Sequence, residues 1–98
     1  MIRLLVLLFA LGGVALAQVA QDERAKTQAE AEAGDVEAAF MLGRMYRDGV
    51  GGAQDEAEAR VWLKQAADAG HVRASVLLGL MLMAGQGGDA DFPAARPY

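Results

Sequence analysis

Few side chains in this chain could do chemistry, and only one pair has a spacing that suggests a reaction. His71 and Ser75 lie four residues apart, so a helix would place both on one face, where an imidazole could activate a hydroxyl. They are the only histidine and the only serine, and cysteine is absent. No carboxylate or oxyanion donor accompanies the pair. We therefore interpret His71 as a solvated turn residue and Ser75 as a small packing residue.

Two glycine-rich segments and one acidic segment could suggest ligand binding. Gly49–Gly52 and Gly85–Gly88 contain the glycines of a phosphate-binding loop, but no strand precedes them and no Lys-Ser or Lys-Thr follows. The acidic residues from Asp55 to Glu58 lack the ligand spacing of a calcium loop and suit the start of a helix instead. These patterns predict turns and a helix end, with no catalytic residue, cofactor or metal.

The elements that hold these residues repeat with a period of 36 residues. Residues 34–62 align without a gap on residues 70–98, and twelve of the 29 pairs are identical, five of them glycines. A period in this range is typical of solenoids, in which each unit buries its apolar face against its neighbour. The repeat therefore favours a binding scaffold.

The composition between the glycines is helical. Ala, Leu, Met, Glu, Gln and Arg predominate, and no segment alternates as a half-buried strand would. We predict an all-α fold, an α/α solenoid of antiparallel helical hairpins with about four helices. They span roughly Val19–Ala33, Asp35–Arg47, a segment from Asp55 to Gly70, and His71–Ala84. Gly43 and Gly79, at equivalent mid-helix positions, predict close helix–helix approach.

The first 17 residues read as a signal peptide. Arg3 precedes an apolar run from Leu4 to Ala17, and Ala15-Leu16-Ala17 has the form of a signal-peptidase site, which predicts cleavage after Ala17. An uncleaved anchor is the alternative, although the run is short for a membrane span. We expect export, to a bacterial periplasm or to the exterior. The net charge of −4 argues against binding nucleic acid or an anionic membrane surface.

The repeat divides the rest of the chain into three parts. Residues 18–33 align with the second helix of a repeat but replace its apolar positions with polar ones, which predicts a polar capping helix. Residues 34–69 form a complete repeat. Residues 70–98 form a second repeat that is incomplete, because its last helix would stop at Tyr98 and contain Pro97.

The pattern within the complete repeat resembles the Sel-one-like repeat, a helix–turn–helix relative of the tetratricopeptide repeat. The matching positions are Ala38, Phe40, Leu42, Gly43, Tyr46, Gly49, Gly51, Asp55, Ala59, Trp62, Lys64, Ala66, Ala67 and Gly70. The resemblance implies a superhelix that acts as a non-enzymatic protein-binding adaptor, with an unknown protein partner. A cysteine-rich branch of the family is β-lactamase-like, and the lack of cysteine makes an envelope hydrolase the weakest alternative.

Two surfaces are candidates for binding. The first is the concave face of the complete repeat, to which we assign Phe40, Arg44, Tyr46 and Arg47. The second is the helix over residues 72–83, whose central residues are apolar on every face, and to which we assign Val76, Leu80, Met81 and Met83. Three explanations stay open for this helix: a truncated or vestigial array, self-association, or a partner-binding surface with adaptable methionines.

Overall fold

Four helices make up the regular structure of the part of the chain that is described. The computed structural model describes residues 2–88, with side chains from residue 15 onward, and contains no strand in that range. The helices are α1 (Ile2–Glu32), α2 (Val36–Asp48), α3 (Glu56–Asp68) and α4 (Val72–Ala84). The all-α prediction is confirmed. Residues 89–98, which hold the end of the predicted second repeat, lie outside the described residues.

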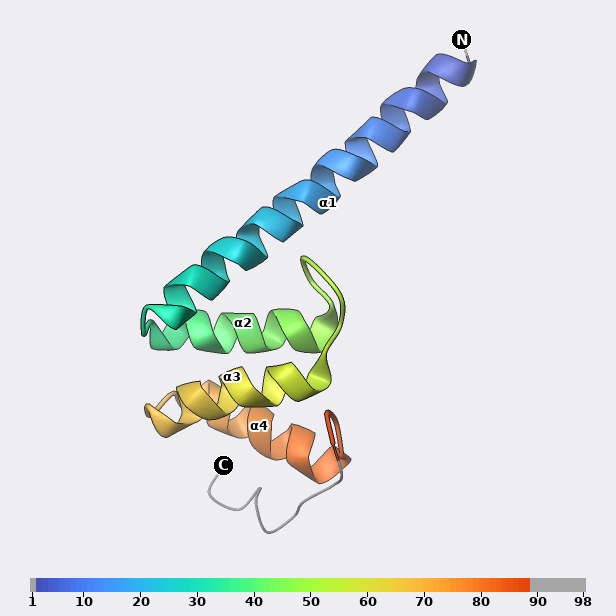
Figure 1. The fold of residues 1–98 in the computed structure, drawn as a ribbon. Coiled ribbons are helices and arrows are strands. Elements are labelled where there is room, and N and C mark those ends of the chain that lie inside the picture. Colours follow the sequence, from blue (N-terminus) through green and yellow to red (C-terminus); the bar gives the residue numbers. More distant parts are fainter. Residues whose placement is uncertain (1, 89–98) are drawn as a thin grey trace.

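The first helix is longer than the sequence predicts. We expected a helix from about Val19, but α1 begins at Ile2 and runs without interruption past Ala17. Leu and Ala favour helix, and no proline separates the apolar leader from the polar segment, so nothing ends the helix between them. Its N-terminal part extends beyond the other helices (Figure 1). Among the described residues, no helix has a stretch long and apolar enough to cross a membrane.

The helices pack as consecutive antiparallel hairpins. Figure 1 shows α1 to α4 arranged in chain order, and α2 contacts both α1 and α3 while α3 also contacts α4. Short side chains fill much of the core, so the helix axes can approach closely. The buried apolar residues are Ala31, Ala38, Ala39, Phe40, Leu42, Ala59, Leu63, Ala66, Ala74, Leu78, Met81 and Leu82.

Gly43 lies where α2 and α3 approach closely. A Cβ added at Gly43 would lie 2.7 Å from Cγ of Leu63 and 3.3 Å from the carbonyl oxygen of Ala59. Such a contact leaves no room for a methyl group without a shift of α3. The prediction of close helix approach is therefore confirmed at Gly43, and its equivalent Gly79 is also buried in α4.

Side chains cap the helices at the predicted boundaries. The Asp35 carboxylate accepts a hydrogen bond from the Ala38 amide at 2.9 Å, and the Asp55 carboxylate accepts one from the Glu58 amide at 3.0 Å. Gly49 ends α2 in the left-handed region, with φ 72°. These caps satisfy backbone groups that the helix ends leave without partners.

The loop after α2 packs on α1 in the same way as the loop after α4 packs on α3. The second half of α1 therefore lies against α2 as α3 lies against α4. The loop after α2 packs on α1, where the Arg24 guanidinium donates from Nη2 to the Ala53 carbonyl at 3.0 Å. The loop after α4 packs on α3, where Arg60 donates from Nε to the Gln86 carbonyl at 2.5 Å. Arg24 and Arg60 are 36 residues apart, so the same kind of contact between an arginine and a loop carbonyl occurs once in each repeat.

Candidate functional site

The Phe40 ring lies at the centre of a polar cluster shared by α2 and α4. The side chain is only 3% exposed. The His71 ring stacks on it with centroids 4.5 Å apart, and the guanidinium carbons of Arg44 and Arg73 lie 5.7 and 5.0 Å from its centroid. Phe40 was predicted as a contact residue of the concave face. That prediction was wrong for the ring itself, because the three side chains around it cover it.

His71 is a structural residue that joins two successive repeats. Its Nδ1 accepts a hydrogen bond from the Ala74 amide at 3.0 Å and so caps α4, while Nε2 lies 2.6 Å from Oε2 of Glu37 on α2. Because Nδ1 accepts, the neutral ring must carry its proton on Nε2, which donates to the carboxylate. The His71 side chain is 13% exposed, so the prediction of a solvated turn residue was wrong.

The Ser75 hydroxyl bonds to the backbone of His71, and the ring nitrogens of His71 bond to other described residues. Its Oγ donates to the backbone carbonyl of His71 at 3.2 Å, as serines on helices often do. Both imidazole nitrogens are already bonded elsewhere. The spacing of four residues therefore produces a helix contact rather than the activated hydroxyl that a hydrolase would need.

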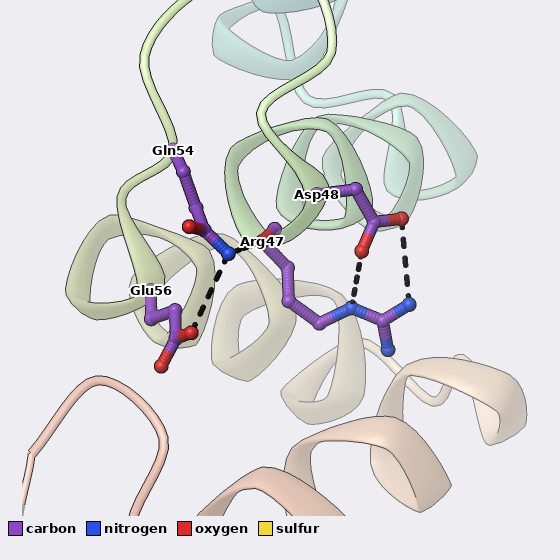
Figure 2. Close-up of polar contacts among 4 residues, drawn as sticks. All are labelled: Arg47, Asp48, Gln54 and Glu56. Carbon is purple, nitrogen blue, oxygen red and sulfur yellow. Dashed lines mark hydrogen bonds and ion pairs between the residues drawn. The ribbon is translucent and has the colours of Figure 1, made fainter.

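Arg47 lies at the end of α2, where its charge is compensated. Figure 2 shows its guanidinium beside the Asp48 carboxylate, with Nε 2.8 Å from Oδ1. Gln54 fastens the following loop by donating from Nε2 to the Arg47 carbonyl at 2.7 Å, and the same nitrogen lies 3.5 Å from Oε1 of Glu56. Of the cations predicted for the concave face, Arg47 is thus already paired.

Tyr46 lies on a different side of α2. Its hydroxyl donates to Oε1 of Gln28 at 3.3 Å, and the guanidinium carbon of Arg24 lies 3.9 Å from the ring centroid. Both partners belong to α1. The prediction that Tyr46 shares a face with Phe40 and Arg44 was therefore wrong, because six residues advance a helix by well over one turn and carry the ring to the α1 side.

A shallow hollow of about 220 Å³ lies beside Arg44. Met41 and Met45 of α2 and Val50 of the following loop supply its apolar lining, and Arg44 and Asp48 supply its polar lining. Met41 and Val50 are exposed, at 43% and 45%. The hollow therefore offers an apolar surface next to a cation.

Arg44 and Arg73 are exposed and carry no ion pair within the described part of the chain. The sequence assignment included Arg44 but missed Glu37, His71 and Arg73. The signal was present in the repeat itself. Position 73 is equivalent to position 37, and at this position the carboxylate of the first repeat is replaced by a guanidinium in the second.

The apolar surface predicted on α4 is present in part. Val76, Leu80 and Met83 are 50% or more exposed and form one stripe with Val72, which is 74% exposed. Met81 is fully buried, so its assignment to this surface was wrong. Its side chain packs in the core cluster that also holds Ala74, because α4 places one face inward despite its uniform composition.

No cluster of three or more potential metal ligands occurs within residues 2–88. The structure thus contains a repeated helical hairpin whose loop packs on the preceding helix, a polar cluster shared by α2 and α4, and exposed apolar residues on α4. Together they define the class, a helical repeat protein built from antiparallel hairpins.

Comparison with known proteins gives the family. The model of the Sel1 repeat matches residues 36–71 and 72–96, and the chain belongs to the Sel1 repeat family. The crystal structure of a Sel1 repeat protein from Oxalobacter formigenes is similar, with a TM-score of 0.73 and 28% sequence identity. The match covers 76% of this chain and 31% of that one, so this chain spans about a third of the length of that protein. A search of curated proteins found no match.

Proposed function

We propose that this protein is an exported adaptor that binds another protein through the face shared by α2 and α4. Sel1 repeats generally mediate protein–protein interaction. The observation that carries the proposal is the pair of exposed guanidiniums, Arg44 and Arg73, fixed over one buried aromatic ring. Two cations held over one ring, one of them lining a partly apolar hollow, suit recognition of a partner surface.

The same geometry favours binding over catalysis. Of the cluster's groups, His71 is used to cap α4 and to bond Glu37, and Ser75 bonds to backbone. No group is left that combines a nucleophile with a base. We therefore propose a non-enzymatic role.

Export is the second part of the proposal, and the sequence of the leader supports it. Cleavage after Ala17 would remove the apolar part of α1 and leave the segment that carries Arg24 and Thr27, both buried against the rest of the molecule. The cleaved helix would keep the residues that dock the loop after α2. Export to the bacterial periplasm is thus compatible with the packing.

The proposal is tested by capture from the envelope of the native host. A tagged chain is cross-linked in cells, purified and analysed by mass spectrometry, in parallel with Arg44→Glu and with Lys26→Glu. Lys26 is an exposed cation on α1 and serves as the matched control. We expect a protein that is captured by the parent and by Lys26→Glu and lost with Arg44→Glu. Capture that is identical in all three chains would contradict the proposal.

The stripe of Val72, Val76, Leu80 and Met83 favours self-association as a second candidate function. Exposed apolar side chains in one row are a typical protein contact surface. Light scattering of the purified chain would show a dimer or larger species that Leu80→Lys converts to monomer. A monomeric parent at high micromolar concentration would rule this candidate out.

A further inference from the structure

We propose that the face around Phe40 binds an acidic peptide segment. Carboxylates of the segment bond Arg44 and Arg73, and a neighbouring apolar side chain enters the hollow lined by Met41, Met45 and Val50. The inference rests on the proposed function, because it names the kind of partner that the same face accepts.

The two guanidiniums come from successive repeats and converge on one ring. Arg44 belongs to α2 and Arg73 to α4, and their guanidinium carbons lie 5.7 and 5.0 Å from the Phe40 centroid. The ring is held by His71, which itself is bonded to Glu37 and to the α4 backbone. Both guanidiniums therefore lie over a ring that is itself held in place, which lowers the entropy lost when a ligand binds.

Neither guanidinium has a carboxylate partner among the described residues, although carboxylates are close by. Glu37 is bonded to His71, and Asp48 is bonded to Arg47. Within residues 15–88, the polar interactions of Arg44 and Arg73 are their contacts with the Phe40 ring. A guanidinium presents several donors in a planar fork that matches a carboxylate, so these two retain donors for a ligand.

The position of Arg73 gives a separate argument. It lies in the first turn of α4, where the helix dipole disfavours a cation, whereas Glu37 occupies the equivalent place in α2 and is favoured there. Arg73 therefore adds nothing to the helix electrostatically. An anionic ligand would compensate this charge.

The hollow beside Arg44 indicates that the ligand also carries an apolar side chain. Its volume of about 220 Å³ has an apolar lining of Met41, Met45 and Val50 and a polar lining of Arg44 and Asp48, whose carboxylate is paired with Arg47. Methionines adapt to side chains of different shape. Because Arg44 lines the same hollow, one ligand can place an apolar side chain there while a nearby carboxylate meets Arg44. The chain as a whole has a net charge of −4, so an acidic segment is favoured only where cations gather locally, as Arg44 and Arg73 do here.

The test is selection of displayed random twelve-residue peptides on the full chain. Enriched peptides are synthesised, and their dissociation constants are measured by fluorescence polarisation. We expect the peptides to share an apolar residue with Asp or Glu close to it. Replacing those acids by Asn or Gln, which leaves the protein unchanged, should weaken binding about fivefold for each contact that is lost.

Protein variants then locate the contacts. Arg44→Gln and Arg73→Gln should each weaken binding about fivefold, and the loss should shrink when the peptide already carries the amide. Lys26→Gln is the control and should leave binding unchanged. Circular dichroism melts of each variant confirm that it is folded.

Two results would overturn the inference. If acidic peptides bind the arginine variants as well as the parent, the site is wrong, while the proposed adaptor role still stands on capture from the envelope. If the enriched peptides lack acids, or if none is enriched, the ligand class is wrong. The adaptor role itself fails only when Arg44→Glu also leaves envelope capture unchanged.

Discussion

At the scale of single residues, His71 shows how one side chain can connect two repeats. Its ring caps α4 through Nδ1, bonds Glu37 through Nε2 and stacks on Phe40. In the preceding repeat the equivalent residue, Asp35, caps α2 through its carboxylate. The histidine thus does the work of an ordinary capping residue and adds a contact between α2 and α4.

We predict that His71→Ala lowers the free energy of unfolding by about 1–2 kcal/mol, because it removes both the cap and the ring stacking. His71→Asn keeps a capping oxygen and should lose less. Urea titrations followed by circular dichroism would measure the differences. Equal stability of His71→Ala and the parent chain would show that the contacts of this ring contribute nothing.

The roles of individual residues were only partly predictable from the sequence. The positions of Asp55 and Gly43 in the repeat were enough to predict their roles. Asp55 caps α3, and Gly43 allows the close approach of α2 and α3. Tyr46 was misplaced because a repeat motif gives residue types without saying which neighbour each side chain meets. Met81 was misplaced because a helix that is apolar on every face does not reveal which side faces the core. His71 was misjudged because its two partners, Glu37 and Phe40, come from the preceding repeat and are distant in sequence.

At the scale of elements, α2 and α3 are held together at Gly43. We predict that Gly43→Ala destabilises the fold by about 1–3 kcal/mol, because the added methyl group would overlap Leu63. This cost exceeds the gain of about 1 kcal/mol that alanine brings to a helix. Adding Leu63→Ala to Gly43→Ala should cost less than the sum of the two single changes, and urea titrations would measure this coupling. A Gly43→Ala chain at least as stable as the parent would argue against the close approach.

The docking of α1 on the loop after α2 gives a second prediction for an element. Arg24 is 8% exposed, donates to the Ala53 carbonyl and covers the Tyr46 ring. Arg24→Ala should therefore destabilise the fold by about 1–3 kcal/mol and raise hydrogen exchange in residues 50–53. Lys26→Ala, an exposed change on the same helix, should have little effect. Loop exchange that is unchanged in Arg24→Ala would contradict this role.

The order of the elements was predictable because the repeat carries it. Helix boundaries followed from glycines and caps, and the capping helix was predicted from the polar residues that replace the apolar positions of a repeat in residues 18–33. Arg24 and Arg60, which are 36 residues apart, hold equivalent loops. The start of α1 was not predictable in this way. The apolar leader has its own helical propensity, and no proline separates it from the polar segment.

At the scale of the whole molecule, the apolar leader over residues 1–17 is the basis of the proposed export. We predict cleavage after Ala17, so the exported form begins at Gln18, and Ala17→Asp should block processing because the peptidase requires a small residue there. Mass spectrometry of the periplasmic fraction would show the mature N-terminus. A chain that retains residues 1–17 in that fraction would contradict the prediction.

The most direct test of the account is a photo-crosslinkable amino acid placed in the living host at position 41, with position 61 as the control. Met41 lines the hollow beside Arg44, whereas Val61 is 58% exposed on α3. We predict that position 41 forms an adduct with one defined partner protein and that position 61 does not. Equal adducts from both positions, or adducts only with further copies of this chain, would contradict a specific binding face on α2 and α4.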